Sequence, residues 1–142
     1  MVRRTRTRRV DSAEAPRYAE TGRVFLESAR ALSTVADEGA PYGNAIALLG
    51  IHAAISYTDA LSIGYGGRKS GDEHAKAVGT LRSILGARLP DIQAKTLGRI
   101  LLQKDLVSYQ GTYYTLPDGQ KLLKLAESYC RWAMETLQHR PG

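Results

Sequence analysis

The stretch that decides the fold is YGNAIALLGIHAAISYTDALSIGY, residues 42–65. Its apolar residues extend almost all round the predicted helix, and the main polar interruptions are His52, Ser56 and Asp59. A helix that is apolar on every side is normally buried at the centre of a larger domain. The polar interruptions argue against a membrane span. The sequence therefore predicts a central core helix that neighbouring helices must cover.

Amphipathic helices are predicted on either side of this stretch. Apolar residues at steps of three and four predict helices over about 17–36, 74–85, 91–103 and 116–137. Residues 106–115 are rich in valine, tyrosine and threonine, which favours a small β-like hairpin or an extended element. Short connections favour antiparallel neighbours. The expected fold is an all-α, up-and-down bundle of four to five helices, forming a single domain over 16–140.

The formal net charge of +6 comes mainly from the N-terminus. No acidic residue precedes Asp11, and such a run of like charges repels itself, so residues 1–15 are expected to form a disordered basic arm. Arginine-rich arms bind nucleic acid, although many are merely solvated. The candidate nucleic-acid-binding residues are Arg3, Arg4, Arg6, Arg8, Arg9 and Lys69.

Cysteine and histidine usage argues against a metal or other cofactor. Cys130 is the only cysteine, which excludes an intrachain disulfide and a thiolate cluster, and its apolar surroundings predict a buried thiol. The three histidines, His52, His74 and His139, are scattered along the chain. A lone cysteine fits a reducing compartment, and no apolar signal segment is evident. A cytoplasmic protein without a membrane partner is therefore expected.

In residues 68–74, RKSGDEH, five residues separate an arginine from a histidine. Metal-free RNA cleavage needs a group that takes the proton of the 2′-hydroxyl and a cation that stabilises the phosphate as charge develops. Histidine titrates near neutral pH and arginine has a planar, permanently charged guanidinium, so the two residues supply these groups. Arg68 and His74 are the candidate catalytic pair. The alternative is a solvated loop arginine and a histidine packed against a neighbouring helix.

A second polar group lies within the central helix itself. His52, Ser56 and Asp59 fall at steps of four and three, hence on one helix face. A histidine–carboxylate pair there could orient a catalytic imidazole. In a packed helix such groups more often satisfy each other or form a polar interface that fixes register or partner choice.

Tyrosines cluster around the predicted hairpin. Tyr109, Tyr113 and Tyr114, with Lys104 and Lys121 nearby in the sequence, could stack nucleic-acid bases. Packing of the hairpin onto the bundle would explain the same residues.

Four stretches of the chain together resemble the HEPN domain family. They are residues 44–61, 67–74, 101–109 and 126–132, and the likeness spans about residues 18–138. The resemblance implies a compact helical bundle that commonly pairs two protomers. It also implies either a metal-independent RNase, often the toxin of a toxin–antitoxin pair, or a non-catalytic member that binds nucleotides, RNA or a nucleotidyltransferase. The family signature of an arginine, four to six residues and a histidine matches Arg68 and His74.

The expected protein is therefore a HEPN-like homodimer that acts as a metal-independent endoribonuclease or binds RNA beside a nucleotidyltransferase or antitoxin. The apolar surface of the central helix, which a small bundle struggles to cover, also favours the homodimer. Two alternatives remain. One is a DNA-binding regulator whose C-terminal half is winged-helix-like, and the other is a non-catalytic protein-interaction module.

Overall fold

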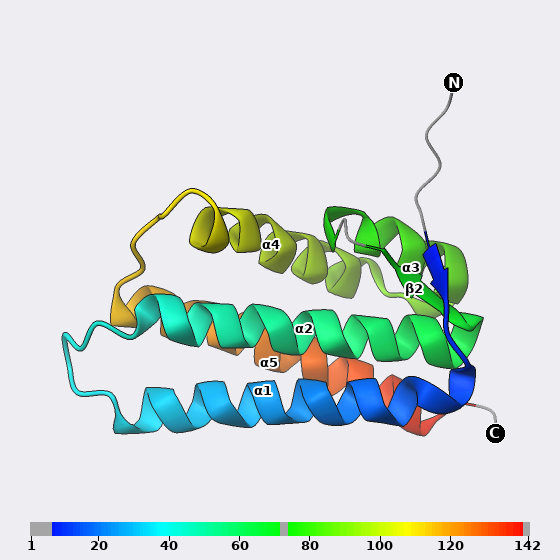
Figure 1. Cartoon of the computed structure of the whole chain (residues 1–142), viewed down its shortest axis with the longest axis horizontal. Coiled ribbons are helices and arrows are strands. Elements are labelled where there is room, and N and C mark those ends of the chain that lie inside the picture. Colours follow the sequence, from blue (N-terminus) through cyan, green and yellow to red (C-terminus); the bar gives the residue numbers. More distant parts are fainter. Residues whose placement is uncertain (1–6, 72–73, 141–142) are drawn as a thin grey trace.

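The computed structural model describes residues 7–71 and 74–140. In this part of the chain five α-helices form a bundle (Figure 1). They are α1 (Ala15–Val35), α2 (Gly43–Gly66), α3 (Ala77–Leu85), α4 (Asp91–Ser108) and α5 (Leu116–Gln138). Short 3-10 helices, η1 (Ser12–Glu14), η2 (His74–Lys76) and η3 (Gly86–Arg88), adjoin α1 and α3. The all-α bundle predicted from the sequence is confirmed.

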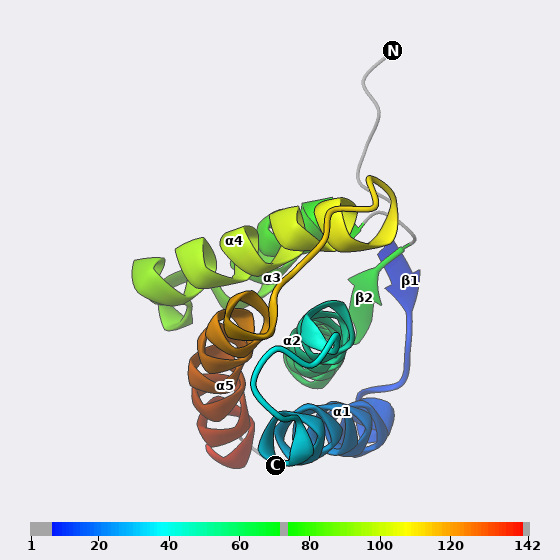
Figure 2. The same cartoon turned by 90° about the vertical axis from the view of Figure 1, so that its left-hand side faces the viewer.

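Helix α2 is the centre of the bundle. It packs most extensively on α1 and α5 and also contacts α3, α4 and β2, the short strand that follows it (Arg68–Ser70). Viewed end-on, these elements surround it (Figure 2). By length and composition α2 could cross a membrane, but 83% of its apolar window is buried inside the bundle. The other helices therefore cover the apolar surface of α2, as the sequence predicts they must.

The first turns of α2 and α5 approach so closely that only glycine fits at their contact. A Cβ atom on Gly119 would lie 2.4 Å from the backbone oxygen of Gly43, and one on Gly43 would lie 2.1 Å from the oxygen of Thr115. Further along the same interface, Thr58 and Tyr129 share a buried hydrogen bond between their hydroxyl groups. The two helices thus run side by side in the same direction (Figure 1).

Thr115 caps α5, as its place before Leu116 and Pro117 in the sequence predicts. Its hydroxyl accepts a hydrogen bond from the Asp118 N–H at 3.2 Å, and the Asp118 carboxylate accepts one from the Thr115 N–H at 3.0 Å. This reciprocal capping box satisfies two backbone donors that a helix start leaves without partners.

Ser70 and Glu73 also have the spacing of a capping box in the sequence, which predicts the start of the third helix there. Ser70 ends β2 instead, and α3 starts after Lys76.

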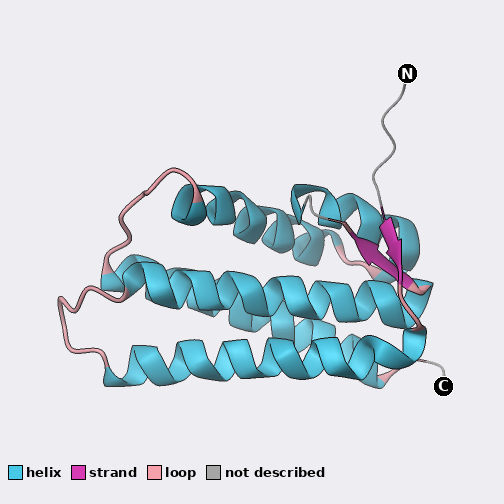
Figure 3. Cartoon of the chain, viewed as in Figure 1, coloured by secondary structure: helices cyan, strands magenta, loops and turns pink. Residues whose placement is uncertain are grey.

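Residues 106–115 form no strand. The first three complete α4, which is longer than predicted, and residues 109–115 make a connection whose last part is extended (Figure 3). Asn44 of α2 holds this connection: its side-chain amide donates to Thr112 O at 2.7 Å and its carbonyl accepts from the Tyr114 N–H at 2.8 Å. Thr112 O and the Tyr114 N–H, which a hairpin would pair with another strand, are therefore hydrogen-bonded to α2 instead.

The two-stranded sheet lies at the other end of the bundle. Strand β1 (Thr7–Arg9) pairs antiparallel with β2 (Arg68–Ser70), and Val10 continues the ladder by donating to Gly67 O at 3.0 Å. The expectation of disorder over residues 1–15 is therefore wrong for residues 7–15. Charge repulsion predicts disorder for this segment taken alone. That prediction could not include β2, a strand distant in the sequence whose free backbone groups form hydrogen bonds with residues 7–9. Arg3, Arg4 and Arg6 lie outside the described residues.

The glycine contact predicts an asymmetry between two glycine-to-alanine variants. Gly119→Ala should lower the free energy of unfolding by at least about 2 kcal/mol, because its methyl group meets backbone that cannot rotate away. Gly98→Ala in α4, where an added Cβ meets nothing within 4 Å, should raise stability by about 0.5–1 kcal/mol. Urea unfolding of both variants tests this. Equal effects of the two substitutions would contradict the close contact.

Candidate nucleic-acid interface

The two short strands form a basic ribbon, defined here as Arg8, Arg9, Arg68 and Lys69. In their register Arg8 lies opposite Lys69, and Arg9 lies opposite Arg68. Directly opposed residues of an antiparallel pair share one face of the sheet, and like charges in that position destabilise it. Arg8 and Arg9 are exposed, whereas Arg68 and Lys69 are half-buried. The ribbon thus concentrates positive charge at the end of the bundle where α2 finishes (Figure 1).

Lys69 is held against the bundle by a buried carboxylate. Its Nζ lies 3.8 Å from Asp59 Oδ2 and 5.4 Å from the centre of the Tyr18 ring, on α1. Asp59 is only 6% exposed. Burial raises the pKa of the Asp59 carboxyl to about 6, although the neighbouring Lys69 ammonium acts in the opposite direction. Lys69 therefore anchors the ribbon. The remaining charges are those of Arg8, on the same face of the sheet as Lys69, and of Arg9 and Arg68, which share the other face.

Arg68 and His74 lie on neighbouring segments at this same end. The Arg68 Nη2 donates to Ser83 Oγ of α3 at 3.3 Å. His74 is half-buried and opens η2, which contacts α3 and α4. Both members of the candidate catalytic pair therefore border α3. Asp72 and Glu73, between them in the sequence, lie outside the described residues.

His52 and Asp59 do not form the histidine–carboxylate pair that their spacing suggested. The His52 ring packs on Phe25 of α1, with 5.6 Å between ring centres, and burial together with the nearby Lys104 lowers its pKa. Asp59 pairs with Lys69 instead, and the chain itself covers it. Ser56 is half-buried. The histidine–carboxylate pair is therefore not formed, whereas a polar interface at these residues that fixes register or partner choice stays a prediction.

The three tyrosines separate into one packed and two exposed side chains. Tyr114 is buried, and its hydroxyl donates to Gln103 Oε1 at 2.9 Å. Tyr109 and Tyr113 are 74% and 67% exposed, and the Lys104 ammonium lies 5.6 Å from the Tyr109 ring centre. The packing explanation thus holds for Tyr114, whereas the other two rings face solvent.

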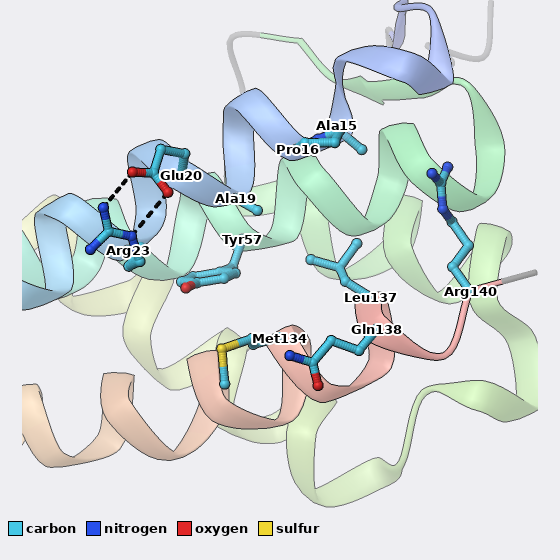
Figure 4. A pocket seen from close by; sticks show the side chains of 10 residues that line it. All are labelled: Ala15, Pro16, Ala19, Glu20, Arg23, Tyr57, Met134, Leu137, Gln138 and Arg140. Atoms are coloured by element: carbon cyan, nitrogen blue, oxygen red, sulfur yellow. Dashed lines mark hydrogen bonds and ion pairs between the residues drawn. The ribbon is translucent and has the colours of Figure 1, made fainter. Parts of the chain in front are cut away.

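Sequence reasoning did not find the groove between the start of α1 and the end of α5 (Figure 4). It has a volume of about 320 Å³, and its walls include Ala15, Ala19, Met134 and Leu137. At its rim Glu20 and Arg23 form an ion pair with each other. The walls are mostly apolar and bring together no group of acid–base or nucleophilic side chains.

Neither a metal site nor a reactive thiol is evident in the described part of the chain. Within residues 7–71 and 74–140, no three His, Cys, Asp or Glu side chains lie close enough to hold a metal ion. Cys130 is buried as predicted, and burial raises the pKa of its thiol to about 12. At neutral pH the thiol stays protonated and is a poor nucleophile.

Comparison with known proteins gives no match: no family model, no curated protein and no solved structure is significantly similar to this chain.

The buried Asp59 predicts a pH dependence of stability. Its pKa is higher in the folded chain than the ordinary 3.8, so the folded state binds more protons between about pH 4 and 6. This carboxyl therefore favours folding most below pH 4, and that contribution, up to about 3 kcal/mol, is lost as the pH rises through 6. Relative to wild type, Asp59→Asn should become more stable as the pH rises.

Urea unfolding at pH 4.5, 5.5 and 7 measures this difference. Asp37→Asn, which changes an exposed carboxylate in the α1–α2 connection, is the control. Parallel stability profiles of wild type and Asp59→Asn would contradict the role given to the buried carboxyl.

Proposed function

We propose that this chain is a HEPN-like helical bundle that binds RNA through its basic ribbon. The observation that carries the proposal is the register of the two strands, which sets Arg8 opposite Lys69 and Arg9 opposite Arg68. The resemblance of the sequence to the HEPN family favours RNA as the nucleic acid.

The electrostatics of the ribbon support an anionic ligand. Opposed like charges weaken the strand pair. Asp59 relieves the repulsion between Arg8 and Lys69, because its carboxylate lies 3.8 Å from the Lys69 ammonium, whereas no ion pair with a described residue relieves the repulsion between Arg9 and Arg68. Bound phosphate groups would relieve it, and the arginine guanidinium matches phosphate geometry with two parallel N–H donors. In the sequence Arg3, Arg4 and Arg6 directly precede the ribbon, and they remain candidate residues for the same ligand.

Salt dependence tests the ribbon directly. Each phosphate neutralised on a single strand contributes about −0.7 to the slope of log K against log salt. The double variant Arg8→Gln/Arg9→Gln should therefore reduce the slope for a single-stranded RNA by about 1.4. Fluorescence anisotropy between 50 and 300 mM salt measures the slope.

The control is Arg17→Gln/Arg23→Gln, which removes two exposed arginines that are paired with glutamates on the same helix face. The control should keep the wild-type slope. Equal slopes for the ribbon variant and wild type would show that the ribbon does not contact phosphate.

Cleavage of the bound RNA is the second candidate function. Arg68 belongs to the ribbon, so a strand seated there brings a phosphate to its guanidinium, and His74 lies on the next element of the chain. In this mechanism His74 takes the proton of the 2′-hydroxyl, whose oxygen attacks phosphorus. The bond from phosphorus to the 5′-oxygen breaks, this oxygen leaves with the proton that His74 returns, and a 2′,3′-cyclic phosphate remains. Arg68 stabilises the charge on the phosphoryl oxygens.

If the protein cleaves RNA, activity should persist in EDTA. His74→Ala should then lower the rate by about 10²–10⁴-fold. Arg68→Ala should lower it by about 10²–10³-fold. Thermal unfolding of both variants shows whether the fold is kept. Wild-type inactivity on several RNAs, with a destabilised His74→Ala, would leave a binding protein without catalysis.

Assembly and location complete the proposal. We retain a homodimer, with an antitoxin or a nucleotidyltransferase as further partner, and a cytoplasmic location. The apolar surface of α2 no longer argues for the dimer, because one chain covers most of it. The winged-helix alternative loses its premise as well, since residues 106–115 contain no strand. If the protein does not bind RNA in the salt-dependence experiment, the remaining alternative is a non-catalytic protein-interaction module.

A further inference from the structure

A second basic groove lies between α4, the 109–115 connection and α5. Its volume is about 620 Å³, within the range of small-molecule sites. Its lining includes three cations, Arg99, Lys121 and Lys124, and one carboxylate, Asp118. The groove begins at the end of the bundle opposite the basic ribbon, so it is a separate surface (Figure 1).

Two of the three cations that line this groove have no partner among the described residues. The side chains of Arg99 and Lys124 form no ion pair or hydrogen bond with any described residue. Asp118 is committed to the α5 cap: hydrogen bonds from Thr115 lower the pKa of its carboxyl, with a smaller contribution from the positive charge of Lys121. The lowered pKa keeps Asp118 ionised, so the groove carries three positive charges and one negative charge and remains basic.

Tyr113 is presented to this groove on a fixed backbone. The residues on both sides of it are bonded to Asn44, through Thr112 O and the Tyr114 N–H, and the Tyr114 hydroxyl is bonded to Gln103. The Tyr113 side chain itself is 67% exposed. An exposed ring on an anchored segment can stack on a planar ligand with little loss of conformational freedom.

We infer that this groove binds a nucleotide unit, whose base stacks on Tyr113 and whose phosphate contacts Lys121, Lys124 and Arg99. An aromatic platform beside a basic groove is the arrangement by which proteins hold single-stranded nucleic acid, since every base has a face that can stack. The unit is either a free mononucleotide or one nucleotide of a single strand. The site goes beyond the basic ribbon, which presents no exposed aromatic ring among its four residues.

Substitutions at Tyr113 test the stacking contact. Stacking of one base corresponds to about 5- to 150-fold in affinity, so Tyr113→Ala should weaken binding of a fluorescein-labelled oligouridine 15-mer by that factor. Tyr113→Phe keeps the ring and should bind as wild type does. Tyr109→Ala, which removes an equally exposed ring outside the groove, is the matched control and should also bind as wild type does.

A 15-mer with abasic sites separates stacking from phosphate contact. Tyr113→Ala should not change its affinity, whereas Lys121→Gln/Lys124→Gln should reduce the salt slope by about 1.4 for both oligonucleotides. Lys95→Gln, an exposed lysine of α4 outside the groove, should leave the slope nearly unchanged. Calorimetry with uridine monophosphate then distinguishes a free nucleotide, if it binds in a Tyr113-dependent way, from a strand, if only the oligonucleotide does.

The experiments distinguish a failure of the groove proposal from a failure of the ribbon proposal. If Arg8→Gln/Arg9→Gln weakens oligouridine binding but the substitutions at Tyr113, Lys121 and Lys124 change nothing, the inference is overturned and the proposed function stands. If the groove variants weaken binding while the ribbon variant does not, the groove is the nucleotide site and the proposed ribbon is wrong. Equal losses for Tyr113→Ala and Tyr109→Ala would also overturn the inference.

Discussion

The contact between the first turns of α2 and α5 is the constraint on which the rest of the structure depends. Without a side chain on Gly43 or Gly119, backbone meets backbone, and the two helices can lie side by side in the same direction. Parallel neighbours cannot be joined by a short turn, so the chain between them returns through α3 and α4. These elements, with α1, complete the cover around α2. Burial of this apolar helix removes a large hydrophobic surface from water and therefore stabilises the fold.

The buried core also determines where surface charge collects. Asp59 is covered by the bundle, and an ionised carboxylate is tolerated there only beside a cation. Lys69 supplies that cation and thereby holds β2 against α2, and its ammonium also lies 5.4 Å from the centre of the Tyr18 ring on α1. Once β2 is in place its free edge accepts Thr7–Arg9, and the arginines of both strands are brought together. A carboxylate inside the fold thus positions the basic ribbon on its surface.

Local patterns in the sequence predicted what depends on local structure. The apolar run of α2, the Thr115 cap and the burial of Cys130 each follow from neighbouring residues alone. The ribbon does not, because its strands are about sixty residues apart and the arginine-rich segment carries no strand pattern of its own. The His52–Asp59 hypothesis failed for a geometric reason. Residues seven apart share a helix face but lie about 10 Å apart along the axis, too far for a hydrogen bond.

The two basic surfaces differ in what they can recognise. If both proposals hold, the ribbon, which carries arginines and no exposed ring, contacts phosphates and gives affinity without sequence preference. The groove adds the exposed Tyr113 ring, and stacking on it would make affinity depend on the presence of a base. Helix α2, which separates the two ends, is about 36 Å long, so a short oligonucleotide occupies one surface at a time. A strand long enough to reach both binds the second surface as an intramolecular step, and its affinity then rises with length without any new contact.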